Sequence, residues 1–131
     1  MKKLLLLLIP FILFTTCEKD NDISHANEPI VTHTIFVGNF YYDPPNITIN
    51  QGEEIRWIND GGLHDVNGEI NSLNNLPFNN PESFNSPSTS TIGAEIYRHK
   101  FNTHGFYNYD CSVGGHAING MTGTITVIGI D

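Results

Sequence analysis

The fold of this chain is decided by the stretch YNYDCSVGGHAINGMTG, which runs from Tyr107 to Gly123. The residues at its start alternate between aromatic and polar, and residues 124–130 after it alternate again, as the residues of β-strands do. The stretch therefore predicts one loop between two strands, in which the glycines allow tight turns. That loop carries a thiol, an imidazole and a thioether at a Cys-x4-His-x4-Met spacing: Cys111, His116 and Met121.

A thiolate, two imidazole nitrogens and a weak axial thioether are the donors of copper sites that transfer electrons. His64 is the candidate for the second histidine, since it follows the glycine-rich bend Asp60–Gly62 after a predicted strand, where the loops of a sandwich gather. We therefore expect one copper ion, alternating between the +1 and +2 states, with these ligands: His64, Cys111, His116 and, in the axial position, Met121. Zinc is the second candidate metal, although it would favour another cysteine or a carboxylate over methionine.

Residues beside these ligands are candidates for supporting roles. Asp65 is expected to fix the loop of the neighbouring histidine, and the carbonyl of Leu63 to approach the metal opposite the axial ligand. Backbone N–H groups of the tight loop are expected to donate to the thiolate sulfur. Ala117 and Ile118 form a candidate docking patch, because weak redox encounters use small apolar surfaces.

Runs of β-branched and aromatic residues that end at turn residues predict the other strands. The predicted strands are Ile30–Val37, Asn46–Asn50, Glu54–Asn59, Ala94–Arg98, Phe106–Asp110 and Gly123–Ile130, and a further extended piece is expected to begin at His64. Residues 40–45 are expected to form a turn, and residues 67–90 one long loop insertion that is functional or lid-like. Seven to eight short strands without a long helix favour an all-β sandwich, with Trp57 in its core.

The N-terminus has the pattern of a secretory leader. Two lysines precede an apolar run from Leu4 to Phe14, which is too short to span a membrane stably. Small residues directly before Cys17 resemble the cleavage site of bacterial lipoproteins, a family in which that cysteine is lipidated and becomes the first residue. We therefore expect a signal peptide over residues 1–16, a polar tether over residues 17–29 and a copper-binding domain over residues 30–131. This predicts export to a bacterial cell envelope, in the periplasm or at the surface, with a lipid anchor in the membrane.

Composition limits the classes of partner. The chain has 6 Lys+Arg against 14 Asp+Glu, a net charge of −8, and removal of the leader with its two lysines leaves −10. Nucleic acid is excluded as an expected partner, because binding to it depends on clustered positive charge. About 115 residues after the leader suit one domain, expected to be a monomer. If Cys17 carries lipid, Cys111 has no disulfide partner, and a metal explains how one thiol persists in an oxidising compartment.

Three segments together resemble the cupredoxins, the plastocyanin–azurin family of type 1 blue copper proteins. They are Pro45–Asn59, His64–Val66 and Gly105–Val127, and the resemblance extends over nearly all of residues 30–131. It implies a Greek-key β-sandwich with copper at one end, one-electron transfer as the activity, and the same four ligands. The four residues between the cysteine and the second histidine are more than plastocyanin itself has, so the subfamily stays open.

The function expected first is that of an electron carrier with a transient redox partner. No acid–base pair, nucleophile motif or second set of copper ligands stands out in the sequence, so we do not expect an enzyme. The alternative is a copper-storage or copper-delivery lipoprotein that uses the same ligands without a redox partner. A vestigial site is the third interpretation, and the intact ligands argue against it.

Overall fold

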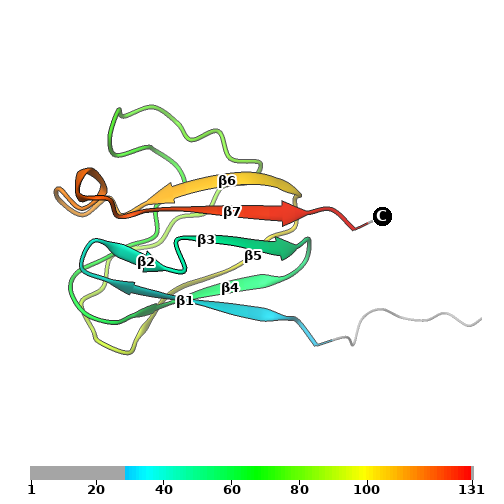
Figure 1. Cartoon of the computed structure of the whole chain (residues 1–131), viewed down its shortest axis with the longest axis horizontal. Coiled ribbons are helices and arrows are strands. Elements are labelled where there is room, and N and C mark those ends of the chain that lie inside the picture. Colours follow the sequence, from blue (N-terminus) through cyan, green and yellow to red (C-terminus); the bar gives the residue numbers. More distant parts are fainter. Residues whose placement is uncertain (1–28, 131) are drawn as a thin grey trace, which may run out of the picture.

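The computed structural model describes residues 29–130 of the chain. These residues contain seven strands, which form two sheets. One sheet has the order β2 (Tyr41–Asp43), β1 (Thr32–Gly38), β4 (Glu54–Asn59), β5 (Glu95–Lys100); the other has β3 (Asn46–Asn50), β7 (Thr122–Ile128), β6 (Gly105–Asp110) (Figure 1). The predicted all-β sandwich is confirmed, and among these residues the one helical element is the short 3-10 helix η2 (Ala117–Asn119). The predicted leader, Cys17 and the tether up to residue 28 lie outside the described residues.

The two sheets join strands that are far apart in the sequence. β1 pairs in parallel with β4, and β3 with β7, whereas the remaining pairs are antiparallel. The chain crosses between the sheets after β2, after β3 and after β5, as the crossovers of a Greek-key sandwich require. These crossovers bring the end of β4 and the end of β6 to the same pole of the molecule.

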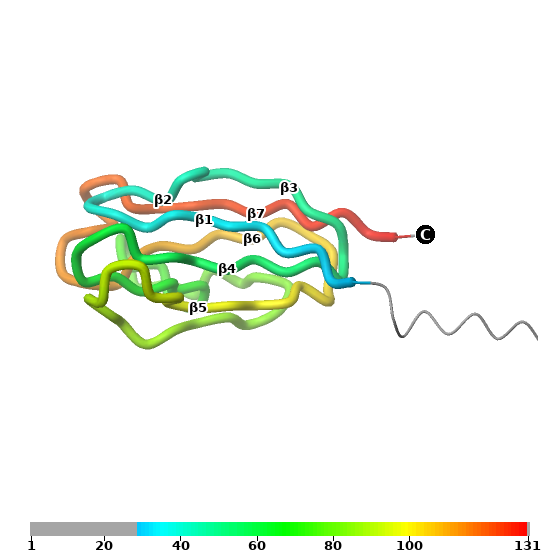
Figure 2. The backbone as a smooth tube through the Cα atoms, turned by 90° about the horizontal axis from the view of Figure 1, so that it is seen from below, coloured from blue at the N-terminus to red at the C-terminus, as the bar shows by residue number. Residues whose placement is uncertain are grey.

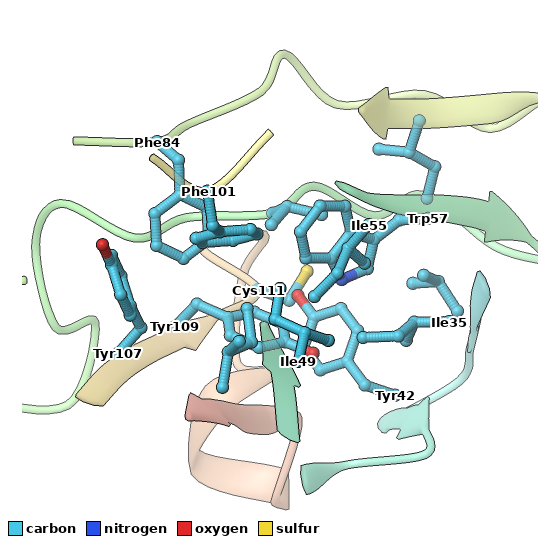
Figure 3. Close-up of a cluster of buried hydrophobic side chains, with 14 of the residues drawn as sticks. Ile35, Tyr42, Ile49, Ile55, Trp57, Phe84, Phe101, Tyr107, Tyr109 and Cys111 are labelled. Carbon is cyan, nitrogen blue, oxygen red and sulfur yellow. The ribbon is translucent and has the colours of Figure 1, made fainter. Parts of the chain in front are cut away.

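The core between the sheets combines aromatic side chains with isoleucines and valines. In β4, Ile55 and Trp57 are buried while Arg56 is exposed, so the strand alternates as its sequence predicts. Trp57 meets Tyr109 of the opposite sheet edge-on, with ring centroids 5.8 Å apart, and the Tyr42 and Tyr109 rings lie 4.7 Å apart (Figure 3). Such large side chains contribute most of the buried apolar area that holds two sheets together.

The predicted turn at residues 40–45 contains a strand. β2 pairs with β1 in the register Val37↔Tyr42, and this places Tyr42 in the core with its hydroxyl donating to the carbonyl oxygen of Asp65 at 2.7 Å. The hairpin turns at Phe40, which has a positive φ of 64°. Three residues are too few for an alternating pattern to stand out, so the sequence did not separate this strand from the turns beside it.

The long segment between β4 and β5 has no strand, and its only ladder contacts are isolated bridges. Its first part lies beyond β6 in Figure 1, and Asn80 fastens the segment to β6 by bonding the backbone N–H and carbonyl of Asn108, at 2.8 Å each. Phe84 of this segment is buried in the core among Trp57, Phe101 and Tyr107. The predicted loop insertion is therefore real, but it is packed as part of the fold.

The loop between β6 and β7 lies at one pole of the sandwich. The start of β1 and the C-terminal end lie at the opposite pole, as Figures 1 and 2 both show. Within residues 29–130 no helix has the length and apolar character that crossing a membrane requires.

Candidate metal centre

The loop that carries Cys111, His116 and Met121 starts directly after β6 and ends where β7 begins, as the sequence predicts. The N–H of Cys111 donates to the carbonyl of Met121 at 3.2 Å, and the N–H of Met121 donates to the carbonyl of His116 at 3.1 Å. Gly120, with a φ of 96°, ends η2 and lets the chain turn back toward β7. All three candidate ligands are thus fixed by backbone bonds within one short loop.

His64 reaches the same pole through a bend that Asn59 shapes. The buried side chain of Asn59 donates to the carbonyl of Gly62 and accepts from the N–H of Gly61, both at 3.0 Å. The carbonyl of Gly61 in turn accepts from Nε2 of His64 at 2.7 Å. This bond keeps the proton on Nε2, so Nδ1 offers its lone pair to a metal. The sequence analysis did not predict that Asn59 shapes this bend. Its position on the same strand face as the buried Ile55 and Trp57 was a signal that its amide needs polar partners.

The three strong donors converge on one point. Nδ1 of His116 lies 3.4 Å from Sγ of Cys111, and Nδ1 of His64 lies 3.9 Å from it. The donor atoms of the three residues all lie within 4.8 Å of one another, and residues 29–130 hold one such group. Met121 is completely buried at the end of the same loop. One soft sulfur and two imidazole nitrogens fit copper, and their spacing suits a single ion between them.

Comparison with known proteins agrees with this donor set. Residues 30–128 match the family model for copper-binding proteins of the plastocyanin/azurin family. The chain belongs to this family. A plastocyanin from Scenedesmus fuscus is 33% identical over 92 residues, which cover 69% of this chain and 89% of that protein. Since the family binds copper and this chain has the donors for it, one copper ion is the cofactor of this cupredoxin.

Two solved structures show how widely the fold is shared. A purple cupredoxin from Nitrosopumilus maritimus is 28% identical, with a TM-score of 0.55, and the match covers 72% of this chain and 97% of that one. A mutant of amicyanin in its reduced state is 20% identical, with a TM-score of 0.54 and coverage of 75% of this chain and 81% of that one. At 20% identity the amicyanin match shows the fold alone.

Burial sets the protonation of the two innermost donors. It raises the pKa of the Cys111 thiol to about 11, although the backbone N–H groups of Asp65 and Val113 act in the opposite direction. The same cause lowers the pKa of His64, against the effect of its bond to Gly61. In the metal-free cupredoxin at neutral pH, the cysteine is therefore a neutral thiol and His64 a neutral imidazole.

Metal binding should therefore release one proton per ion between pH 7 and pH 9. A metal binds the thiolate, and Cys111 keeps its proton until the pH approaches 11, whereas His64 has already lost its own above pH 6.5. The apparent affinity should rise by up to about tenfold per pH unit across this range. Calorimetric titration in two buffers of different ionisation enthalpy measures the released protons. A value near zero would contradict thiol coordination.

Asp65 connects the two segments that carry the ligands. Its carboxylate accepts from the N–H of Ser112 at 2.7 Å and from the hydroxyl of Ser112, the residue that follows Cys111. It thereby links the residue after His64 to the residue after the cysteine. The side chain of Leu63 is about half exposed, and the approach of its carbonyl to the metal stays a prediction.

The surface above the site combines an expected residue with one that the sequence analysis missed. Ile118 is 79% exposed, whereas Ala117, on the buried side of η2, is only 5% exposed, so it adds little to an outer patch. Phe40, which is about half exposed, meets the ring of His116 edge-on, with centroids 5.3 Å apart. Phe40 belongs to the β1–β2 hairpin, and no local pattern in the sequence connects it with His116.

Proposed function

We propose that this cupredoxin is a type 1 copper protein that carries one electron at a time between protein partners. His64, Cys111 and His116 would hold the copper ion, and the thioether of Met121 would be its weakest donor. When bound, copper supplies a one-electron couple between its +1 and +2 states. The observation that carries the proposal is the convergence of two Nδ1 atoms on one buried sulfur, at 3.4 and 3.9 Å.

In this proposal the protein keeps the donor atoms of the four ligands in fixed positions. The bond from His64 to Gly61 fixes one ring, and the backbone bonds of the loop fix Cys111 and Met121. Donors that do not move between oxidation states allow electrons to pass without rearrangement of the site. Rigid donors of this kind suit a carrier better than a site that must release its metal.

A docking surface is available where the site comes nearest to solvent. His116 is partly exposed, and apolar side chains that are about half exposed or more surround this pole: Phe40, Leu63 and Ile118. A small apolar rim suits a weak, short-lived encounter with a redox protein. We therefore propose a monomeric carrier that is not an enzyme and that docks through this pole.

The cellular setting of the proposal rests on the sequence of residues 1–29. The leader and the small residues before Cys17 support export, lipidation at Cys17 and retention at a bacterial cell envelope. Mass spectrometry of the membrane-bound protein tests this directly, since lipidation should leave a diacylated cysteine as the first residue. A mature chain that begins elsewhere would contradict the anchor and leave the copper site unaffected.

The test of function is a titration of the metal-free protein with Cu(II), followed by repeated cycles of reductant and oxidant. We expect one copper per chain, an intense visible band, and complete bleaching and recovery with the copper retained. Loss of copper to a chelator at each reduction would favour the storage and delivery alternative. A colourless protein that binds zinc more tightly than copper would contradict both.

A further inference from the structure

Two carboxylates lie buried on either side of Cys111. Asp110, the residue before it, is 1% exposed, and Asp65, which is bonded to the residue after it, is 6% exposed. The metal-binding argument above needs neither charge. Acidic side chains are seldom buried without a cation beside them, so this pair requires an explanation.

Both carboxylates are held by neutral donors. Asp65 accepts from the N–H and the hydroxyl of Ser112. Asp110 accepts from the side-chain amide of Asn67 and the N–H of Ser72, each at 2.7 Å, and from the Ser72 hydroxyl at 2.9 Å. The partners of both carboxylates are therefore amide and hydroxyl groups, which carry no charge.

No cation neutralises these charges within the described part of the chain. The ion pairs there join other acids to Arg98, His33 and His99. None of them includes Asp65 or Asp110. Two carboxylates without a cation beside them are therefore neighbours of copper ligands, and because each is at most 6% exposed, water screens their fields less than it would at an open surface.

We propose that Asp65 and Asp110 hold the reduction potential of the site low. The proposal rests on the function proposed above. When the site gives one electron to its partner, its charge becomes more positive by one unit, and two fixed negative charges stabilise this oxidised state over the reduced one. Both residues are positioning residues that act through the field at the site and through Cys111 and Ser112.

If the bonds of Asp65 and Asp110 only support the structure, a variant that keeps the bonds and loses the charge should leave the reduction potential unchanged. Asn in place of Asp65 keeps an acceptor for the N–H of Ser112 and offers a donor to its hydroxyl, so the link between the two segments persists while the charge is lost. Asn at position 110 keeps the acceptor for Ser72, but its amino group opposes that of Asn67. Asp65→Asn is therefore the cleaner variant.

The test compares the copper-loaded full chain with Asp65→Asn, Asp110→Asn and Glu69→Gln in potentiometric titration. Glu69→Gln is the matched control, because this exposed glutamate lines the same 450 Å³ polar hollow as Asp65 and loses the same charge. We expect the ratio of oxidised to reduced protein at a fixed potential to fall about tenfold in each aspartate variant, equivalent to about 59 mV. The control should change it less than twofold.

A second measurement uses the metal-free protein and separates charge from structure. Amide hydrogen exchange at Ser112 should stay protected in Asp65→Asn, which shows that the link between the two segments is kept. If Asp110→Asn fails to fold, Asp65→Asn alone decides the proposal. A reversible wild-type couple with unchanged potential in Asp65→Asn overturns this inference and leaves the carrier function standing, whereas a wild type without any reversible couple overturns both.

Discussion

Cys111→Ser should abolish the intense visible absorption of the copper-loaded protein. That absorption arises from charge transfer between a thiolate and Cu(II), and Cys111 is the cysteine toward which both Nδ1 atoms point. Serine is close in size, and a buried hydroxyl costs about 1–3 kcal/mol, so the fold should persist. Absorption spectra recorded during Cu(II) titration, beside circular dichroism of the metal-free variant, measure both effects.

The matched control is Cys17→Ser, which removes the other cysteine of the chain and should leave the band intact. Weak copper binding through the two histidines of Cys111→Ser would still fit the proposed site, provided that the intense band is absent. Survival of the band in Cys111→Ser would place the thiolate elsewhere and contradict the assignment of the ligands.

Phe84→Ala should destabilise the fold by about 3–5 kcal/mol, a large share of the stability of a domain of this size. The Phe84 ring packs against Trp57, Tyr107 and Tyr109 with centroids 6.0 to 6.3 Å away, and against Phe101 at 5.5 Å. Truncation leaves a cavity in the middle of this cluster and frees the segment between β4 and β5 from the core. Denaturant unfolding of the metal-free protein measures the loss.

Leu76→Ala is the control from the same segment, since Leu76 is 61% exposed and should cost less than about 0.5 kcal/mol. Equal effects of the two substitutions would mean that the segment is a loose cover, as its sequence suggested. A large effect of Phe84 alone would establish it as part of the core.

The strands that face both the core and solvent could be predicted from the sequence. β3 and β4 begin and end at the predicted residues, and the alternation of Ile55, Arg56 and Trp57 shows why: the side chains themselves record which face is buried. β2 could not be predicted, because its three residues depend on pairing with β1. The parallel pairing of β1 with β4 likewise follows from the crossovers and leaves no trace in local periodicity.

The residues of the candidate site likewise fall into those that local sequence predicts and those that only the tertiary structure reveals. The spacing of Cys111, His116 and Met121 is local, so one loop was enough to predict it. His64 was found because its bend ends a strand. The contact of Phe40 with His116 and the bonds of Asp110 with Asn67 and Ser72 join segments that only the tertiary structure brings together. The burial of Phe84 could not be predicted either, because its neighbours in the sequence are polar and show no alternation of apolar and polar residues.

The position of the chain ends has a practical consequence. The described chain begins and finishes at the pole opposite the loop of Cys111 and His116 (Figure 2). A linker to a gold electrode, or a fused redox enzyme, can therefore be attached beyond Ile130 without obstructing the copper-bearing pole. An electrode-bound film made in this way would present every molecule with its copper pole outward, so current could be recorded from partners supplied in solution.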